Sequence, residues 1–232
     1  MLVNSPKALA IELPGLAIGS RSDRFSIAAF NQAISRADRM RMAKSASEVS
    51  ADIIAARAAA ECLFDAAAVE RAVDQLAVRL ALRLHGTHPI VMCVMHGGVI
   101  LTGELLLRLH FPLEVSYVHA TRYRDATRGA ALEWPALPST DVGGRTVLLV
   151  DDVLDEGHTL AAVVERLRES GATSVVTGVL VDKDIGRPRP VRVDEAALHC
   201  PDRFLFGHGM DYRGHWRNLP GIYALPVGWS AP

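Results

Sequence analysis

Apolar and polar positions alternate in blocks along most of the chain, and the spacing inside the blocks switches between strand-like and helical. Short apolar runs of strand length occupy residues 89–96, 113–120, 146–151, 174–182 and 203–210. Apolar residues at helical spacing occupy residues 99–110 and 159–170. Strands that are apolar throughout and alternate with helices are typical of a mainly parallel sheet flanked by helices. The pattern predicts an α/β fold, whose ligands bind outside the carboxyl ends of the strands.

The beginning of the chain follows another pattern. Within residues 1–50, the first twenty residues show no clear hydrophobic period. In residues 25–43, apolar residues recur at helical spacing between arginines. We expect an N-terminal arm or helical extension there, packed on the domain or on a partner subunit. Residues 46–86 indicate helices, with Asp65 as an N-cap and Gly86 as a stop. The predicted boundaries are therefore 1–50 for the extension and 51–232 for the domain.

Composition narrows the class of protein. The chain has 232 residues, half of them apolar, and a formal net charge of −1, which suits one large globular domain and argues against a general nucleic-acid binder. No apolar run reaches the roughly 20 residues of a membrane span, so we expect no membrane partner. Three cysteines without a C-x-x-C pair favour a reducing cytoplasm. We interpret Cys62, Cys93 and Cys200 as small buried hydrophobes.

Two strand ends carry residues suited to anions and cations. The stretch "VMHGGV" (94–99) runs from a strand into Gly97 and Gly98, where backbone amides at a helix start can approach an anion. The stretch "VLLVDDVLDEGHTL" (147–160) ends an apolar strand in four carboxylates, followed by a glycine and a threonine. Such carboxylates can hydrogen-bond sugar hydroxyls or help to hold Mg²⁺. The chain lacks G-x-x-x-x-G-K-[ST] and G-x-G-x-x-G, which excludes the commonest nucleotide-binding loops.

The stretch 147–160 resembles the signature of the type I phosphoribosyltransferases, and other segments resemble their 6-oxopurine branch, the hypoxanthine-guanine phosphoribosyltransferases. "VMHGGVILTGELL" is similar to the pyrophosphate loop, "ATRYRDATRG" to the mobile loop and "LVDKD" to the strand end that carries the purine-contacting lysine. "PDRFLFGHGMDYRGHWRNLPGIYAL" (201–225) resembles the C-terminal block. The resemblance covers about residues 60–225 and implies the fold of that family, a mainly parallel central sheet with flanking helices and a small hood region.

The resemblance also implies a reaction and a set of roles. N9 of hypoxanthine or guanine would be joined to C1 of 5-phosphoribosyl-1-diphosphate (PRPP), releasing pyrophosphate, with Mg²⁺ as cofactor. Asp155 would be the general base near purine N7. The 5′-phosphate and ribose would be held by Asp151, Asp152, Asp155, Glu156, Gly157, His158 and Thr159. Pyrophosphate would be held by Met95, His96, Gly97 and Arg217. Purine-site residues would be Lys183, Phe204, Leu205 and Asp211, mobile-loop residues Arg122 and Tyr123, and metal ligands Asp151, Asp152 and Asp211.

Three details of this resemblance lead to further expectations. The Met95–His96 peptide can be cis in the family. Glu156 stands where the family most often has threonine, and His96 stands where lysine is frequent, so we expect weaker attraction for PRPP. One of Phe204 and Phe206 should face the core and the other the site, because the two alternate as in a strand.

The residues leave two alternatives to this function open. A xanthine-preferring phosphoribosyltransferase would share the chemistry, since xanthine differs only at position 2. A PRPP-sensing regulator that binds nucleic acid on the same fold is disfavoured by the retained Asp155 and Lys183 and by the absence of a basic net charge. The expected partners are PRPP and a 6-oxopurine, without nucleic acid, in a cytoplasmic homodimer or homotetramer.

Overall fold

The computed structural model describes residues 50–122 and 132–230. The chain divides into two units at Ser50 and Ala51, and everything below concerns the second unit. The expected N-terminal extension and Tyr123 lie outside the described residues. Arg122 ends a strand, and only its backbone is described.

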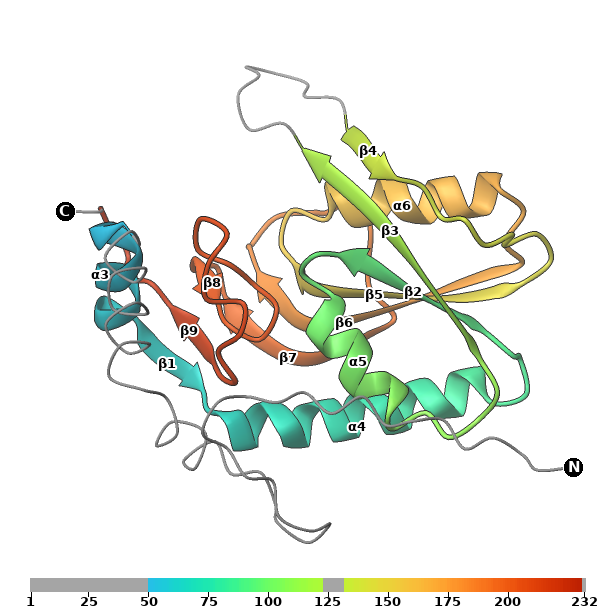
Figure 1. Ribbon diagram of the computed structural model, residues 1–232, viewed down its shortest axis with the longest axis horizontal. Helices are drawn as coiled ribbons and strands as arrows, with labels where there is room; N and C mark the ends of the chain where they lie inside the picture. Colours follow the sequence, from blue (N-terminus) through green and yellow to red (C-terminus); the bar gives the residue numbers. More distant parts are fainter. Residues whose placement is uncertain (1–49, 123–131, 231–232) are drawn as a thin grey trace, which may run out of the picture. The chain divides into compact units, whose positions relative to one another are not determined.

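Four helices and nine strands form the described part of the chain (Figure 1). The helices are α3 (Ala51–Ala59), α4 (Ala66–Leu84), α5 (Val99–Leu106) and α6 (His158–Glu169). The strands are β1 (Glu61–Phe64), β2 (Ile90–Met95), β3 (Glu114–Arg122), β4 (Leu132–Ala136), β5 (Thr146–Leu154), β6 (Ser174–Asp184), β7 (Glu195–Pro201), β8 (Leu205–Phe206) and β9 (Ile222–Ala224). No helix of these described residues has the length and apolar character to cross a bilayer.

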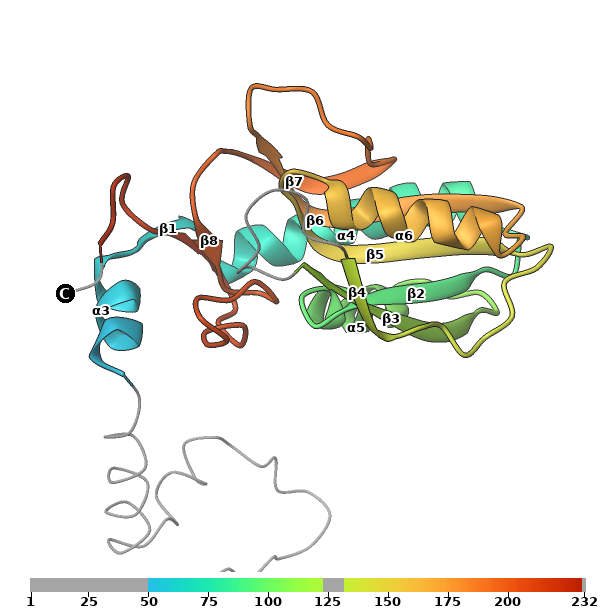
Figure 2. The same cartoon turned by 90° about the horizontal axis from the view of Figure 1, so that it is seen from above.

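Six strands form a central sheet in the order β4-β3-β2-β5-β6-β7. All neighbours are parallel except the β3–β4 pair, which is antiparallel. Helices α4 and α5 cover one face of the sheet and α6 covers the other, as Figure 2 shows from a second side. The predicted α/β class with a mainly parallel sheet is confirmed. In this arrangement the carboxyl ends of β2, β5 and β6 lie along one edge.

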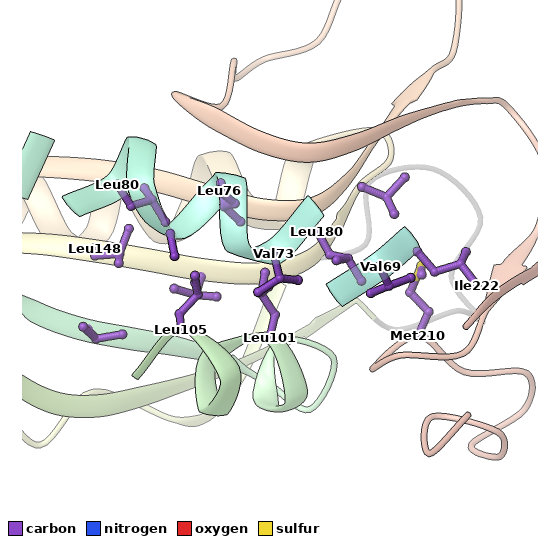
Figure 3. Packing of buried hydrophobic residues seen from close by; sticks show 14 of the residues in the cluster. Val69, Val73, Leu76, Leu80, Leu101, Leu105, Leu148, Leu180, Met210 and Ile222 are labelled. Carbon is purple, nitrogen blue, oxygen red and sulfur yellow. The ribbon is translucent and has the colours of Figure 1, made fainter. Parts of the chain in front are cut away.

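The larger core cluster joins α4, α5 and the sheet. The side chain of Asp65 accepts a hydrogen bond from Ala68 N at 2.8 Å and caps α4, as the sequence predicts. Leu76 and Leu80 of α4 are fully buried, and Figure 3 shows them facing the apolar side chains of the sheet and of α5. Each buried leucine of this kind contributes roughly 2 kcal/mol to folding, so this face of α4 anchors the helix to the sheet.

A second, smaller sheet has the order β1-β9-β8 and is antiparallel. The prediction of helices through residues 46–86 is wrong at residues 61–64, which form β1 and pair with β9 far along the chain. That tertiary pairing overrides the local helical preference of an alanine-rich stretch. The prediction of a strand over 203–210 is too long, since only Leu205 and Phe206 are in β8. Met210 and Ile222 from this region extend the core past Val69 of α4 (Figure 3).

Besides β1 and β9 of the small sheet, two strands of the central sheet escaped the sequence pattern. Strand β7 is a short edge strand of mixed burial, and β4 lies within the polar stretch 120–146. β4 contains Pro135, which an edge strand tolerates because one side of its backbone pairs with no neighbour. Both strands lack the apolar signal of central strands.

The three cysteines divide between core and surface. Cys93 and Cys200 are buried as predicted, and burial raises the pKa of both thiols. The prediction for Cys62 is wrong, because this residue is exposed on β1, a strand with little cover.

Candidate active site

The strand ends of β2 and β5 meet so closely that glycine is required between them. A Cβ atom on Gly97 would lie 2.0 Å from Oδ2 of Asp152, and one on Gly98 would lie 2.6 Å from the carbonyl oxygen of Val150. The Gly-Gly pair therefore lets the loop after β2 touch the acidic end of β5. The peptide between Met95 and His96, at the start of this loop, is cis, as the family resemblance suggested.

Asp151 and Asp152 form a partly buried acidic pair at this junction. The backbone N–H of Asp152 donates to Oδ1 of Asp151 at 2.9 Å. Burial raises the pKa of both carboxyls, and for Asp151 the charge of Asp152 adds to the increase. Two adjacent carboxylates with raised pKa values gain from a cation or from hydroxyl donors, because either one relieves their mutual repulsion.

Arg217 links this acidic pair to the C-terminal block. Its guanidinium lies 2.5 Å from Oδ1 of Asp211 and 4.0 Å from Oδ2 of Asp152, and it donates to the carbonyl oxygen of Gly209 at 2.6 Å. Gly209 has a φ of +105°, and a Cβ there would lie 2.3 Å from the carbonyl oxygen of Gly97. The C-terminal block thus packs directly on the loop after β2 and brings Asp211 and Arg217 to the strand ends.

The loop from β5 into α6 has the geometry of an anion site. Gly157 has a φ of +80° and precedes His158 and Thr159, the first residues of the 12-residue helix α6. Backbone amides at such a helix start attract negative charge. The carboxylate of Glu156 accepts a hydrogen bond from Arg187 at 2.8 Å. Arg187, which the sequence did not single out, therefore offsets part of the negative charge of Glu156 beside this loop.

Lys183 is the centre of the opposite end of the site. Its side chain is only 8 % exposed, and Nζ lies 3.0 Å from Oδ2 of Asp155 and 2.9 Å from Oδ1 of Asp202. Burial acts to lower the pKa of Lys183, but hydrogen bonds to Asp202 and Asp155 outweigh it, so the pKa is raised. The lysine remains a cation and presents only donors.

Phe204 and Phe206 divide between the site and the core as expected. Phe206 is fully buried, whereas Phe204 is 46 % exposed and lines a small cavity. This cavity of about 170 Å³ is lined by Asp152, Val153, Asp155, Lys183, Phe204, Leu205, Met210 and Asp211. Six of these eight residues are among the site residues that the sequence predicts, and they come from three separate segments of the chain.

Other site residues were missed by the sequence interpretation. Asp202 precedes Phe204 by two residues, and its position before an expected site residue was the only available signal. Arg187 belongs to a loop with no recognised motif. His119 on β3 lies against His96, with ring centroids 4.6 Å apart, and burial followed by the neighbouring His96 lowers the pKa of His119. Parallel pairing of Met95 with His119 explains this contact, which no local pattern reveals.

Comparisons of this chain with known proteins all find phosphoribosyltransferases. A model of the phosphoribosyl transferase domain matches residues 59–213. The hypoxanthine-guanine phosphoribosyltransferase of Bacillus subtilis is 30% identical over 159 residues, which cover 68% of this chain and 88% of that protein. The hypoxanthine-guanine-xanthine phosphoribosyltransferase of Tritrichomonas foetus is 30% identical over 158 residues, covering 68% and 86%.

Solved structures agree with the sequence relatives. A hypoxanthine-guanine-xanthine phosphoribosyltransferase superposes with a TM-score of 0.65 at 28% identity, covering 71% of this chain and 96% of that one. A hypoxanthine phosphoribosyltransferase from Staphylococcus aureus has the same fold, with a TM-score of 0.68 at 22% identity and coverage of 73% and 94%. The chain belongs to the phosphoribosyl transferase domain family, in the group of the hypoxanthine-guanine phosphoribosyltransferases.

Proposed function

We propose that this protein is a purine salvage enzyme that transfers the phosphoribosyl group of PRPP to N9 of hypoxanthine or guanine. The products are IMP or GMP and pyrophosphate. The observation that carries the proposal is the cavity in which Asp155, Lys183 and Phe204 lie beside Asp152 and Asp211. A 6-oxopurine needs a group that accepts its proton, a hydrogen-bond donor for its 6-oxo group and an aromatic ring to stack on. The carboxylates of Asp152 and Asp211 can bind the ribose hydroxyls or a metal ion.

The purine end of the cavity selects the base and handles its proton. Lys183 donates to the 6-oxo group, whereas the 6-amino group of adenine would place donors against a donor-only ammonium. Leaving such groups unpaired discriminates strongly between substrates. Phe204 stacks on the ring, and the carbonyl of Leu205 accepts from its N–H groups. Asp155, about half exposed, accepts the purine proton at N7 as N9 forms its bond to C1.

The ribose and phosphate end is built on the acidic pair and the loop after β5. Asp151 and Asp152 accept hydrogen bonds from the ribose hydroxyls. The 5′-phosphate binds the amides of residues 156–159 and the hydroxyl of Thr159, at the start of α6. Arg217 and the backbone of Met95, His96 and Gly97 bind the departing pyrophosphate. We propose that the segment with Arg122 and Tyr123 covers the site during the reaction.

The acidic residues fit the Mg²⁺ that the family implies. Mg²⁺ is usually held by one or two carboxylates together with substrate phosphates and water. Asp151 and Asp152 form a pair with raised pKa values, and Asp211 lines the same cavity as Asp152. Among residues 50–122 and 132–230, no three acidic, histidine or cysteine side chains are grouped so that they could hold a metal ion by themselves, and we propose that PRPP supplies the remaining ligands. Bound there, Mg²⁺ would neutralise charge on the pyrophosphate.

Xanthine is a second candidate substrate. The relatives named hypoxanthine-guanine-xanthine phosphoribosyltransferases favour it, since one is 30% identical to this chain. Xanthine carries a 2-oxo group in place of the 2-amino group of guanine, and the backbone near Leu205 would meet that difference. We further propose that the enzyme acts in the cytoplasm as a homodimer or homotetramer.

The test is nucleotide formation from PRPP and Mg²⁺ with hypoxanthine, guanine, xanthine and adenine in parallel. We expect IMP and GMP, no AMP, and a loss of about 100-fold or more in kcat for Asp155→Asn, typical of a missing general base. Asp184→Asn is the matched control, because Asp184 is exposed and its carboxylate accepts a hydrogen bond from the nearby amide of Gly186. Turnover of no purine, together with PRPP-dependent DNA binding in a gel shift, would contradict the proposal in favour of a regulator.

A further inference from the structure

The ammonium of Lys183 has two acidic partners, although one would suffice to neutralise it. Asp155 and Asp202 lie 3.0 Å and 2.9 Å from Nζ. The lysine side chain is nearly buried, whereas the two carboxylates are 51 % and 53 % exposed. The cation is thus held inside the site by two acids that face solvent and incoming substrate.

The proposed reaction gives Asp155 another task. When a purine occupies the cavity, Asp155 must turn to N7 while Lys183 turns to O6. If Asp155 were the only anion near Lys183, the buried ammonium would lose its partner as the substrate binds. A buried charge without a partner is strongly unfavourable, so the lysine would resist the substrate geometry.

Asp202 occupies the position from which it can keep hold of the lysine. Strands β6 and β7 are parallel, with Lys183 paired to Cys200 and Asp184 to Pro201. Asp202 follows β7 directly, so its carboxylate lies across from the lysine on the neighbouring strand end. A hydrogen bond from Lys183 lowers the pKa of Asp202, which keeps this carboxylate charged at neutral pH.

We propose that Asp202 is a positioning residue that aims Lys183 at the 6-oxo group of the purine. This inference rests on the proposed function and extends it. Asp202 holds the ammonium while Asp155 serves the purine proton, so one N–H of Lys183 stays directed to position 6. The same short segment also carries Phe204, and it therefore supplies both the lysine's support and the stacking ring.

Loss of the Asp202 carboxylate should change folding little, because this carboxylate is about half exposed and Asp155 still pairs with Lys183 in the free protein. Asp202→Asn should therefore fold with nearly the wild-type Tm, and its effect should be on the base. A merely structural role would lower the rate with every purine alike. A positioning role penalises a strong acceptor at position 6 more than a weak one, such as the sulfur of 6-mercaptopurine.

The experiment measures steady-state kinetics of Asp202→Asn with hypoxanthine and with 6-mercaptopurine, in saturating PRPP and Mg²⁺. We expect kcat/KM for hypoxanthine to fall about 10-fold, the usual effect of losing a charged hydrogen bond. The fall for 6-mercaptopurine should be several-fold smaller, and the KM for PRPP should stay within about 2-fold. Asp202→Glu should recover part of the loss, and the control Asp184→Asn should leave both purines unaffected.

Two results would overturn the inference while leaving the enzyme intact. In the first, the wild-type chain makes IMP, and the kcat/KM values of Asp202→Asn are the same as those of Asp184→Asn. The other is an equal loss with both purines accompanied by a lower Tm, which would assign Asp202 to structure alone. A wild-type chain that makes no nucleotide would instead remove the proposed function, and the role of Asp202 with it.

Discussion

The contact between Gly97 and Asp152 allows a double-mutant test of how the site is assembled. A Cβ on Gly97 would lie 2.0, 2.3 and 2.7 Å from Oδ2, Cγ and Oδ1 of Asp152. These three atoms are its nearest neighbours, and all belong to one side chain. Gly97→Ala must therefore displace the Asp152 carboxylate, which is 13 % exposed and has Arg217 4.0 Å away.

The cost follows from overpacking in a rigid site. Inserting one methyl group into a filled space costs about 1–3 kcal/mol, which for a chain of this size lowers Tm by roughly 2–4 °C per kcal/mol. Asp152→Ala removes all three clashing atoms, so Gly97→Ala should cost about 0.5 kcal/mol or less in that background. The expected coupling free energy is therefore about 1–2 kcal/mol.

The assay is urea unfolding of the wild type, the two single variants and the double variant, with the metal removed by EDTA. Gly103→Ala is the matched control within the neighbouring helix α5. Nothing lies within 4 Å of a Cβ at Gly103, and alanine is favoured over glycine in a helix by about 0.5–1 kcal/mol. A coupling free energy near zero would show that Asp152 does not fill the space beside Gly97, and the geometry of the junction would be wrong.

Three other perturbations test separate parts of the site. Because the pKa of Asp151 is raised in the folded chain, the folded chain holds this proton more tightly than the unfolded chain does. The free energy of unfolding should therefore fall as the pH rises from acid through that pKa. Asp151→Asn should accordingly raise the metal-free Tm more at pH 8 than at pH 4. Equal gains at both pH values would refute this. Arg187→Gln should raise the KM for PRPP about 3–10-fold by exposing the phosphate to Glu156, and adding Glu156→Gln should reverse it; a double variant as weak as the single one would contradict the pairing. Phe204→Ala should raise the KM for hypoxanthine about 10-fold through lost stacking with little change in Tm, whereas Phe206→Ala in the core should cost about 3–5 kcal/mol of stability; the reverse pattern would exchange their roles.

The sequence predicts well the elements whose signal is local. Apolar runs reveal β2, β5 and β6, and the spacing of residues 159–170 reveals α6, because burial on both faces of a sheet leaves a continuous pattern. Strands β1 and β9 are short and pair with each other from distant parts of the chain, and β7 is an edge strand of mixed burial. Local preference carries no information about such partners.

The site divides in the same way. The motifs at residues 147–160, 180–184 and 201–225 predict Asp155, Lys183 and Phe204 as site residues. The structure brings these three side chains to one cavity. Arg187 and Asp202 were not predicted, because their importance depends on which side chain of another segment they meet. Glu156 illustrates the point: its charge is visible in the sequence, but the arginine that pairs with it lies 31 residues further along.

The small sheet has a consequence for how the protein is made. Glu61 of β1 pairs with Ala224 of β9, so β1 can enter its sheet only after residues 222–224 have been synthesised. The central sheet closes with β7 at Pro201 and can form while the last residues are still inside the ribosome. Phe204, Asp211 and Arg217 then join only when the C-terminal strand emerges and pairs with β1. In a nascent or truncated chain that ends before β9, Asp151, Asp152, Asp155 and Lys183 would already lie at the ends of the central sheet, whereas Phe204, Asp211 and Arg217 would not yet be held against them.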